Sequence, residues 1–192
     1  MRHGTRFFLL LVALWFSPYQ QATGSDAKLN AQVIAVIDGD TLLLKPLESS
    51  RATPRFYKLR LADIDAPEKD QLFGERAKRE LESLVLYQQV RVATVATDRY
   101  GRRVGWVSVE GVHDVDINAE LVQRGAAWAS TWHQRQPRLL AAQQEAQRAG
   151  RGLWATADAV PPWIWRKQSG HHPGDELSPA FASKPLPSPQ RD

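Results

Sequence analysis

Three short polar motifs interrupt apolar stretches of this 192-residue chain. They are Asp38–Thr41 (DGDT), Arg60–Glu68 (RLADIDAPE) and Asp98–Arg102 (DRYGR). Their carboxylates are typical ligands of hard metal ions, and the planar fork of arginine binds two oxygens of a phosphate. Such residues suit phosphodiester hydrolysis, in which a metal ion polarises the phosphate, a base prepares water and cations stabilise the developing charge.

The residue types of the motifs also indicate which metal ion they would bind. The chain contains no cysteine, and none of the three motifs contains histidine. Zinc sites are built mainly from these two residue types. Ligand sets made only of oxygen atoms indicate calcium or magnesium instead.

Each motif alone has a simpler structural interpretation. An Asp-Gly pair is most often a turn, and Arg60 beside Asp63 or Asp65 is compatible with a surface ion pair worth about 0–1 kcal/mol. Pro67-Glu68 is compatible with the end of a strand followed by the start of a helix. The functional interpretation therefore depends on the three motifs occurring together.

Predicted strands enclose the first and third motifs. β-rich runs at residues 32–37 and 41–45 flank the first motif, and an Asp-Gly pair between such runs predicts a tight hairpin. Runs at residues 90–96 and 103–109 flank the third motif, with a turn at Tyr100-Gly101 between them. The polar residues of both motifs are therefore expected at strand ends.

The second motif ends a further predicted strand. Residues 56–64 alternate between apolar and polar types, which is typical of a strand. Pro67 cannot continue a central strand, so we expect the strand to stop near Ala66. Asp65 and Glu68 are then left at its exposed end.

Three helices are predicted from apolar spacing and capping residues. The first runs from Gly74 to about Gln88, the second follows Asp116 as its N-cap and continues through Arg124, and the third covers residues 137–149. Five strands with interspersed helices predict one α+β domain built on a small β-barrel with about three α-helices. A length of about 125 residues suits a single domain.

Residues 31–154 resemble the thermonuclease family, the staphylococcal nuclease-like proteins. The resemblance rests on several motifs in the family's order: DGDT, RLADIDAPE, Gly74-x-x-Ala77, DRYGR, Asn118, LVQRG at 121–125 and Gly152-Leu153-Trp154. It implies that the barrel is a five-stranded OB-fold, a barrel type that often binds oligonucleotides.

The resemblance implies a set of ligands for a catalytic calcium ion, Ca2+. Asp40 and Asp65 match the side-chain ligands, and Ala66 matches the residue whose backbone carbonyl is a further ligand. Asp38 matches a residue that lies close to these ligands without binding the ion directly. The family's activity is calcium-dependent, so the same dependence is expected here.

The resemblance also implies the residues that act on the substrate. Glu68 matches the residue that positions the attacking water and, by one interpretation, deprotonates it. Arg60 and Arg102 match the pair that holds the phosphate and stabilises its five-coordinate transition state. Arg99 and Tyr100 match the basic-aromatic pair that binds the substrate. Every catalytic position of the family is therefore present.

The nucleotide pocket departs from the family pattern. Thr131 and His133 stand where the type enzyme has tyrosines. Trp128 and Trp132 are alternative platforms for base stacking, which contributes about 1–3 kcal/mol per base. Tryptophans at this spacing are more often core or half-buried residues, so the preference of the pocket stays open.

The resemblance implies an exported, calcium-dependent nuclease that hydrolyses DNA and RNA with little sequence preference and leaves 3′-phosphate ends. Single-stranded or locally unpaired nucleic acid is the expected substrate, and the chain is expected to be a monomer without a stable protein partner. Two alternatives stay open. One is an OB-fold module that binds nucleic acid but catalyses weakly, and the other is an envelope scaffold that holds partners without binding calcium.

Residues 1–24 are predicted to be an export signal. Arg2 and Arg6 precede an apolar run at 7–16, and Ala22-x-Gly24 permits cleavage before Ser25. The run spans about 15 Å, too short for a comfortable membrane helix, although an uncleaved anchor that attaches the protein to the membrane is the alternative. We expect a periplasmic or secreted protein. Cleavage removes two arginines and no acidic residue, so the net charge falls from +4 to +2.

Composition divides the rest of the chain. Residues 25–155 are predicted to form the nuclease-like domain, and residues 156–168 a proline- and tryptophan-rich extension that packs on it. Residues 169–192 are rich in proline and serine and are predicted to be a disordered tail. His171-His172 in that tail has the residue type of a metal site, but adjacent histidines in such a tail more often bind nothing.

Overall fold

The computed structural model describes residues 28–48, 55–111, 114–130 and 136–170. The expected export signal, Thr131, Trp132, His133 and His171-His172 lie outside the described residues. Across the described ranges, no helix is both long enough and apolar enough to span a membrane.

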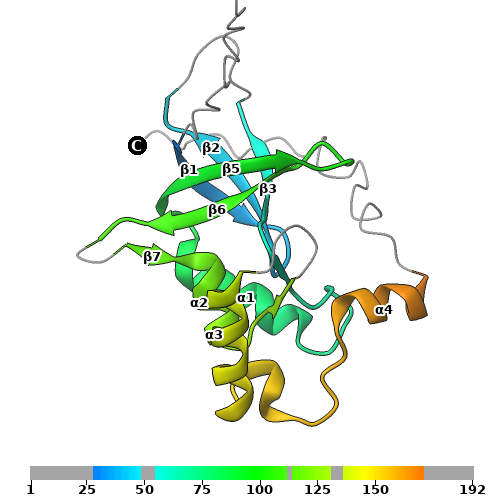
Figure 1. Cartoon of the computed structure of the whole chain (residues 1–192). Helices are drawn as coiled ribbons and strands as arrows, with labels where there is room; N and C mark the ends of the chain where they lie inside the picture. Colours follow the sequence, from blue (N-terminus) through cyan, green and yellow to red (C-terminus); the bar gives the residue numbers. More distant parts are fainter. Residues whose placement is uncertain (1–27, 49–54, 112–113, 131–135, 171–192) are drawn as a thin grey trace, which may run out of the picture.

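Five strands form a closed barrel, which occupies the upper half of Figure 1. They are β1 (Lys28–Val36), β2 (Thr41–Pro46), β3 (Tyr57–Leu61), β5 (Gln89–Thr97) and β6 (Arg103–Val109). Their order is β3-β2-β1-β5-β6, and all of these neighbours are antiparallel. A parallel pairing of β3 with β6 closes the barrel, with Leu59 opposite Arg103. The predicted five-stranded OB-fold of the α+β class is confirmed.

Alternation along each strand sends apolar residues into the barrel. On β3, Tyr57, Leu59 and Leu61 are buried, whereas Lys58 and Arg60 between them are partly exposed. Successive side chains of a strand point to opposite faces, so Arg60 belongs to the outer face. The core is made of aliphatic side chains from all five strands and from helices, including Val33, Leu42, Leu44, Val92 and Leu121.

Helices lie below the barrel and at its side (Figure 1). They are α1 (Gly74–Val85), α2 (Ile117–Gln123), α3 (Pro137–Arg148), the short 3-10 helix η1 (Gly152–Ala155) and α4 (Pro162–Ser169). Asp116 caps α2 as predicted, since its side chain accepts a hydrogen bond from the Ala119 N–H. Helix α1 ends at Val85, three residues before the predicted Gln88, because Tyr87 adopts a positive φ of 63° and donates its N–H to Val33 of β1.

The predicted strand at 56–64 is broken, which corrects the sequence interpretation. Asp63 has a positive φ of 55°, and the Ala62 N–H bonds to Gly105 of β6 instead of continuing the ladder with β2. The chain then forms a two-residue strand, β4 (Ile64–Asp65), which pairs with β8 (Trp128–Ala129). The break carries Asp65 out of the barrel wall toward its mouth. A further short strand, β7 (Val115–Asp116), pairs with β6.

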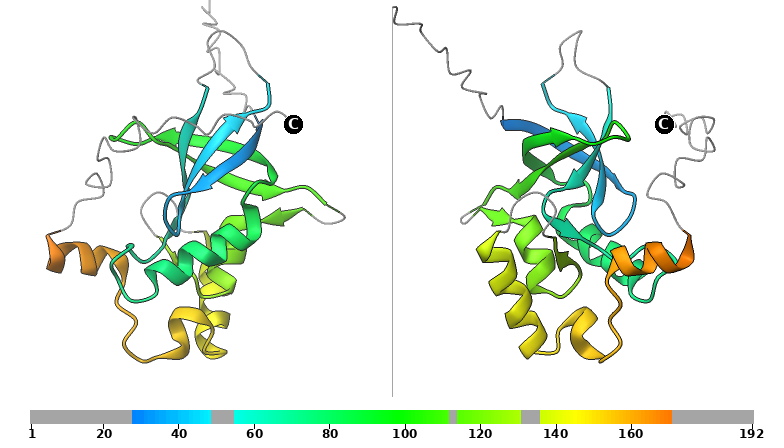
Figure 2. Two further views of the ribbon diagram at one scale, coloured as in Figure 1. Left: turned by 180° about the vertical axis from the view of Figure 1, so that it is seen from behind. Right: turned by 45° about the vertical axis from the view of Figure 1, so that its right-hand side comes forward.

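The segment after η1 returns to the loop that precedes α1, and the two views of Figure 2 place α4 beside that loop. The Gln71 side chain donates a hydrogen bond of 2.5 Å to the Val160 carbonyl. The ring of Trp163 meets that of Trp128 at 5.6 Å, and Trp128 meets Trp154 at 4.2 Å, both edge to face. Aromatic edge-to-face contacts of this kind stabilise packing beyond the area they bury. The extension is therefore docked on the domain through α4, a helix that the sequence pattern did not predict.

Asn118, one of the family's motif residues, joins three elements in the core. It is fully buried at 0% exposure. Its side-chain oxygen accepts from the Val107 N–H at 3.1 Å, and its side-chain N–H groups donate to the carbonyls of Ala62 at 2.9 Å and Gly105 at 3.4 Å. It thereby fastens α2 to β6 and to the turn where β3 breaks.

We predict that Asn118→Ala lowers the free energy of unfolding by about 2–3 kcal/mol, because a buried polar group left without its partner costs roughly 1–3 kcal/mol. Urea denaturation followed by circular dichroism measures this loss. Asn30→Ala is the matched control, since Asn30 is exposed on β1. Equal losses in the two variants would contradict the assigned role of Asn118.

Candidate active site

The first motif forms the β1–β2 turn, and its backbone packs tightly against Ala66 and Ala77. A Cβ atom at Gly39 would lie 2.6 Å from the Cβ of Ala66 and 2.9 Å from that of Ala77. These distances are shorter than any normal carbon contact, so glycine allows the turn to touch both the second motif and α1. The register pairs Thr41 with Arg60, which places Asp40 beside the end of β3.

Asp40 is a buried carboxylate with several donors around it, and it is 5% exposed. One oxygen accepts from the Ala66 N–H at 3.0 Å, and the other lies 2.5 Å from Nη1 of Arg60. Burial alone would raise the pKa of Asp40, but the charge of Arg60 and these hydrogen bonds outweigh it and hold the pKa below its usual 3.8. Asp40 is therefore an anion in the folded protein.

Arg60 connects the first motif to the second. Its Nη2 lies 2.9 Å from Oδ1 of Asp65 and donates to the Ile64 carbonyl at 3.3 Å. Asp65 is 3% exposed, so this contact differs from the surface ion pair considered as an alternative. Burial lowers the pKa of Arg60, yet Asp40 and Asp65 outweigh burial and raise it. Arg60 thus bridges the carboxylates of Asp40 and Asp65 and joins the first motif to the second.

Glu68 is carried by the loop between β4 and α1, which Gln71 holds in shape. The Glu68 N–H donates to the Gln71 side chain at 3.1 Å, and the Gln71 N–H returns a bond to the Glu68 carbonyl at 2.9 Å. A Cβ at Gly74 would lie 1.9 Å from that carbonyl oxygen, so the start of α1 requires glycine. Burial raises the pKa of Glu68, while Arg166 acts against that rise.

The third motif is a turn built around the Asp98 carboxylate. Oδ1 accepts from the N–H groups of Tyr100 and Arg102, both at 2.9 Å, and Oδ2 accepts from Nε of Arg102 at 2.8 Å. The guanidinium groups of Arg99 and Arg102 lie 4.9 and 5.6 Å from the centre of the Tyr100 ring. Asp98 thereby fixes the direction of the Arg102 side chain.

Arg166 on α4 is a residue of this cluster that the sequence reasoning missed. Its Nη1 lies 2.6 Å from Oε1 of Glu68, and its Nη2 lies 2.8 Å from Oδ2 of Asp65. The available signal was the spacing of Trp163 and Arg166, because residues three apart share one face of a helix. The extension, which was expected to pack on the domain, therefore also contributes an arginine to the candidate site.

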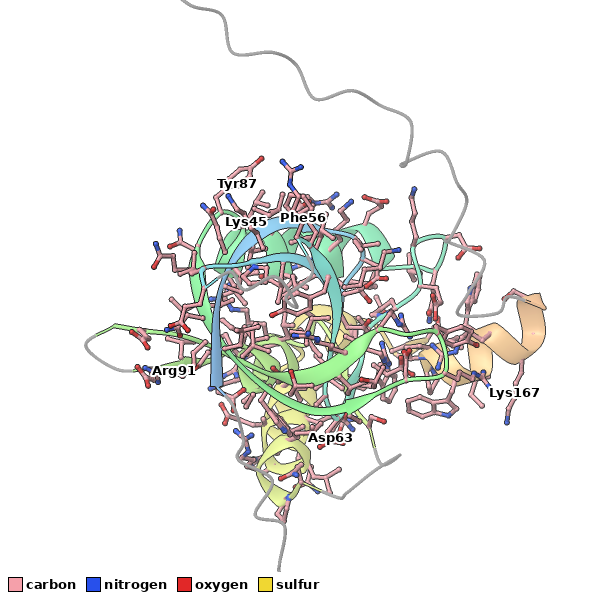
Figure 3. The ribbon with its side chains drawn as sticks, turned by 90° about the horizontal axis from the view of Figure 1, so that it is seen from above. Lys45, Phe56, Asp63, Tyr87, Arg91 and Lys167 are labelled. Atoms are coloured by element: carbon pink, nitrogen blue, oxygen red, sulfur yellow. The ribbon has the colours of Figure 1, made fainter. Side chains whose placement is uncertain are left out.

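A groove of about 700 Å³ collects these side chains. All nine residues predicted for the site line it: Asp38, Asp40, Arg60, Asp65, Ala66, Glu68, Arg99, Tyr100 and Arg102. Helix α4 adds Trp163, Arg166 and Lys167 to the lining, and Figure 3 shows Lys167 extending from α4 toward solvent. Trp128, a candidate stacking platform, packs between Trp154 and Trp163 and does not line this groove.

The donors that a metal ion could use here are oxygen atoms. Asp40 and Asp65 reach the same guanidinium, that of Arg60, so their carboxylates lie close together. Across the described ranges, no three Asp, Glu, His or Cys side chains gather in an arrangement that would hold a metal ion. Two carboxylates, a backbone carbonyl and water oxygens form a set of the kind that calcium accepts.

A closed five-stranded barrel with buried carboxylates and arginines at its mouth defines the class of the protein as an OB-fold domain with a candidate anion-binding groove. The family model described as "Staphylococcal nuclease homologue" matches residues 58–156, about half of the chain, so the chain belongs to this family.

Three bacterial proteins are similar to this chain over more than four fifths of their own length. Protein ParB of Escherichia coli is 40% identical over 153 residues, which cover 76% of this chain and 83% of that protein. An uncharacterized endonuclease of Haemophilus influenzae is 38% identical over 166 residues, 85% of this chain and 84% of that protein. A micrococcal nuclease of Shigella flexneri is 37% identical over 151 residues, 74% of this chain and 83% of that protein.

We predict that Asp98→Asn destabilises the protein in a pH-dependent way. Burial tends to raise the pKa of Asp98, but hydrogen bonds and charge from Arg102 hold it below 3.8. The ionised carboxylate therefore stabilises the fold at neutral pH, and this stabilisation is lost as the pH falls through the folded-state pKa. The variant should be about 1 kcal/mol less stable at pH 7.

Urea unfolding measured in steps from pH 7 toward pH 3 checks this prediction. The difference between wild type and Asp98→Asn should shrink as the pH falls. Asp70→Asn removes an exposed carboxylate before α1 and should show a small difference at every pH. A difference for Asp98→Asn that stays constant with pH would refute the assigned hydrogen bonds.

Proposed function

We propose that this protein is an exported, calcium-dependent nuclease that hydrolyses phosphodiester bonds in DNA and RNA with little sequence preference. The observation that carries the proposal is the convergence of Asp40, Asp65 and Glu68 with Arg60 and Arg102 on one groove. Three separate segments of the sequence supply these residues, and membership of the staphylococcal nuclease-like family agrees with the assignment.

Calcium would be held by Asp40 and Asp65, with the Ala66 carbonyl as a further ligand and Asp38 just behind them. The oxygen donors fit this ion, whereas magnesium demands stricter geometry and dehydrates reluctantly. When bound, such an ion polarises the phosphate and lowers the pKa of nearby water. The Asp40 carboxylate is already ionised, since Arg60 holds its pKa low.

The remaining chemistry is assigned to this chain's own side chains. Glu68 positions the attacking water and takes its proton, and the burial that raises its pKa makes it a better base than an exposed glutamate. Arg60 and Arg102 bind the phosphate oxygens and stabilise their charge in the transition state. Water attacks phosphorus in line, and the bond between phosphorus and the 5′-oxygen breaks. That oxygen takes a proton from solvent water and leaves as a 5′-hydroxyl, while the other fragment keeps a 3′-phosphate.

Substrate would lie along the groove beside the third motif. Arg99 and Tyr100 line the groove next to Arg102, so they offer a cation to the backbone and a ring to a base. We propose that single-stranded or locally unpaired DNA and RNA are preferred, and that the protein acts as a monomer in the periplasm or outside the cell. Binding that depends on phosphate contacts should weaken with salt.

A second candidate function is nucleic-acid binding with weak catalysis. The observation in its favour is that Arg60 bridges Asp40 and Asp65, so the two carboxylates already have a cation between them. A site of this kind binds phosphate through arginines without needing a metal ion. It predicts binding that survives a calcium chelator and no cleavage.

We predict that the protein cleaves single-stranded DNA and RNA when calcium is present, and that cleavage stops when excess calcium chelator is added. Glu68→Gln should reduce the rate by about 100-fold or more, as expected for the loss of a general base. A fluorescence-quench assay on both nucleic acids measures these rates. Glu75→Gln, at an exposed position in α1, is the matched control. Binding without cleavage by the wild type would favour the second candidate.

We predict that Arg102→Ala lowers kcat by about 100-fold, because removing one donor to a developing anion typically costs that much. Its free energy of unfolding should fall by no more than about 1 kcal/mol, because the ion pair with Asp98 is lost while the turn retains the backbone hydrogen bonds from Tyr100 and Arg102 to Asp98. Steady-state kinetics and thermal denaturation provide the two readings, and Arg79→Ala on the outside of α1 is the control. Nearly intact turnover would disprove the role in the transition state.

A further inference from the structure

The guanidinium of Arg166 makes three contacts with two carboxylates of the site. Nη1 lies 2.6 Å from Oε1 of Glu68 and 3.2 Å from Oδ1 of Asp65, and Nη2 lies 2.8 Å from Oδ2 of Asp65. The side chains of Arg166 and Glu68 are each 17% exposed, and the side chain of Asp65 is 4% exposed. The bonds of 2.6 and 2.8 Å are short, charge-assisted and largely shielded from water, which is the setting in which such bonds are strong.

The position of Arg166 is set by the way α4 docks. Pro162, the first residue of α4, is buried, and Trp163 packs against Trp128 of β8. Gln71 links the same region to the Glu68 loop, since it bonds to both Val160 and the Glu68 backbone. Helix α4 and the loop that carries Glu68 are therefore linked, and this link fixes the position of Arg166 relative to Glu68.

The same contacts occupy both carboxylate oxygens of Asp65, which a bound metal ion would also use. Arg60 and Arg166 both donate to Oδ1 of Asp65, and Arg166 donates to Oδ2. A metal ion that binds Asp65 must therefore share or displace the contact made by Arg166. Two cations that use one carboxylate weaken each other's binding.

We propose that Arg166 is a positioning residue of the active site that holds the Glu68 carboxylate in place and competes with the metal ion for Asp65. The first part rests on the proposed nuclease function, and the second rests on calcium binding alone. No motif of the family pattern described above contains Arg166, which comes from the extension beyond the matched residues 58–156.

The proposal makes metal affinity and turnover change in opposite directions when Arg166 is neutralised. Arg166→Gln should bind calcium about tenfold more tightly, because a competing cation is removed from Asp65. Its kcat at saturating calcium should fall about tenfold, because Glu68 loses the bond that orients it, while KM changes little. A purely structural residue would lower stability without tightening calcium binding.

The test combines calorimetric calcium titration, without nucleic acid, with steady-state cleavage of single-stranded DNA by the full chain. Arg148→Gln is the charge-matched control for the titration, because Arg148 is an exposed arginine at the end of α3 and does not line the groove. Its calcium affinity should stay within about twofold of wild type. Asp40→Ala, which removes a proposed ligand, should bind calcium far more weakly and serves as the reference for lost binding.

Arg166→Lys keeps the proposal testable if Arg166→Gln does not fold. Lysine retains the charge but lacks the fork that spans two carboxylates, so calcium affinity should stay near that of wild type while kcat falls. Unchanged or weaker calcium binding by folded Arg166→Gln would overturn the competition. Full turnover by either variant, or a rise in KM alone, would overturn the positioning role.

Failure of the nuclease proposal would be seen separately. A wild-type protein that binds calcium but cleaves neither DNA nor RNA would refute the proposed function, and the calcium titration would still decide whether Arg166 competes for Asp65. Absence of calcium binding by both wild type and Arg166→Gln would overturn the competition itself.

Discussion

The architecture of this site depends on keeping opposite charges paired where water is largely excluded. Asp40 and Asp65 are buried, and a buried carboxylate without a partner is strongly destabilising. Arg60 satisfies both, so the β1–β2 turn, strand β3 and the segment after its break cannot shift independently. The energetic need to neutralise these acids therefore also fixes their positions around Arg60 in the groove. Close packing of Gly39 on Ala66 and Ala77 then excludes alternative positions of the turn.

Much of the fold and most of the proposed site were accessible from the sequence because their signals are local. Alternation predicted the barrel strands, Asp116 predicted the start of α2, and motif order predicted which residues line the groove. The break after Leu61 was not predicted, because it depends on a bond between Ala62 and the distant Gly105. Arg166 was missed for the same reason, because its partners Glu68 and Asp65 lie 98 and 101 residues earlier in the sequence. No local sequence pattern indicates a contact over that separation.

The extension after η1 lies outside the barrel but contributes side chains to the groove. Trp163 and Pro162 bury part of α4, while Gln71 ties the preceding segment to the loop that carries Glu68. This short segment is thus held by contacts of three kinds: aromatic packing by Trp163, the hydrogen bond from Gln71 and the ion pairs of Arg166. Its residues belong to the groove as much as those of the barrel do, and the family match at residues 58–156 ends before them.

Closure of the barrel by the parallel pairing of β3 with β6 has a consequence for how the chain acquires activity. Arg60 lies on β3 and Arg102 directly precedes β6, so the two arginines come to line the same groove when Leu59 aligns with Arg103. Contacts between segments so far apart in sequence form late, because the entropy of the intervening chain must be lost first. A partly folded molecule with its antiparallel hairpins already formed would therefore hold the two arginines proposed to bind phosphate on two hairpins that are not yet paired with each other. During refolding, catalytic competence should emerge with the slowest tertiary step and lag behind the appearance of secondary structure.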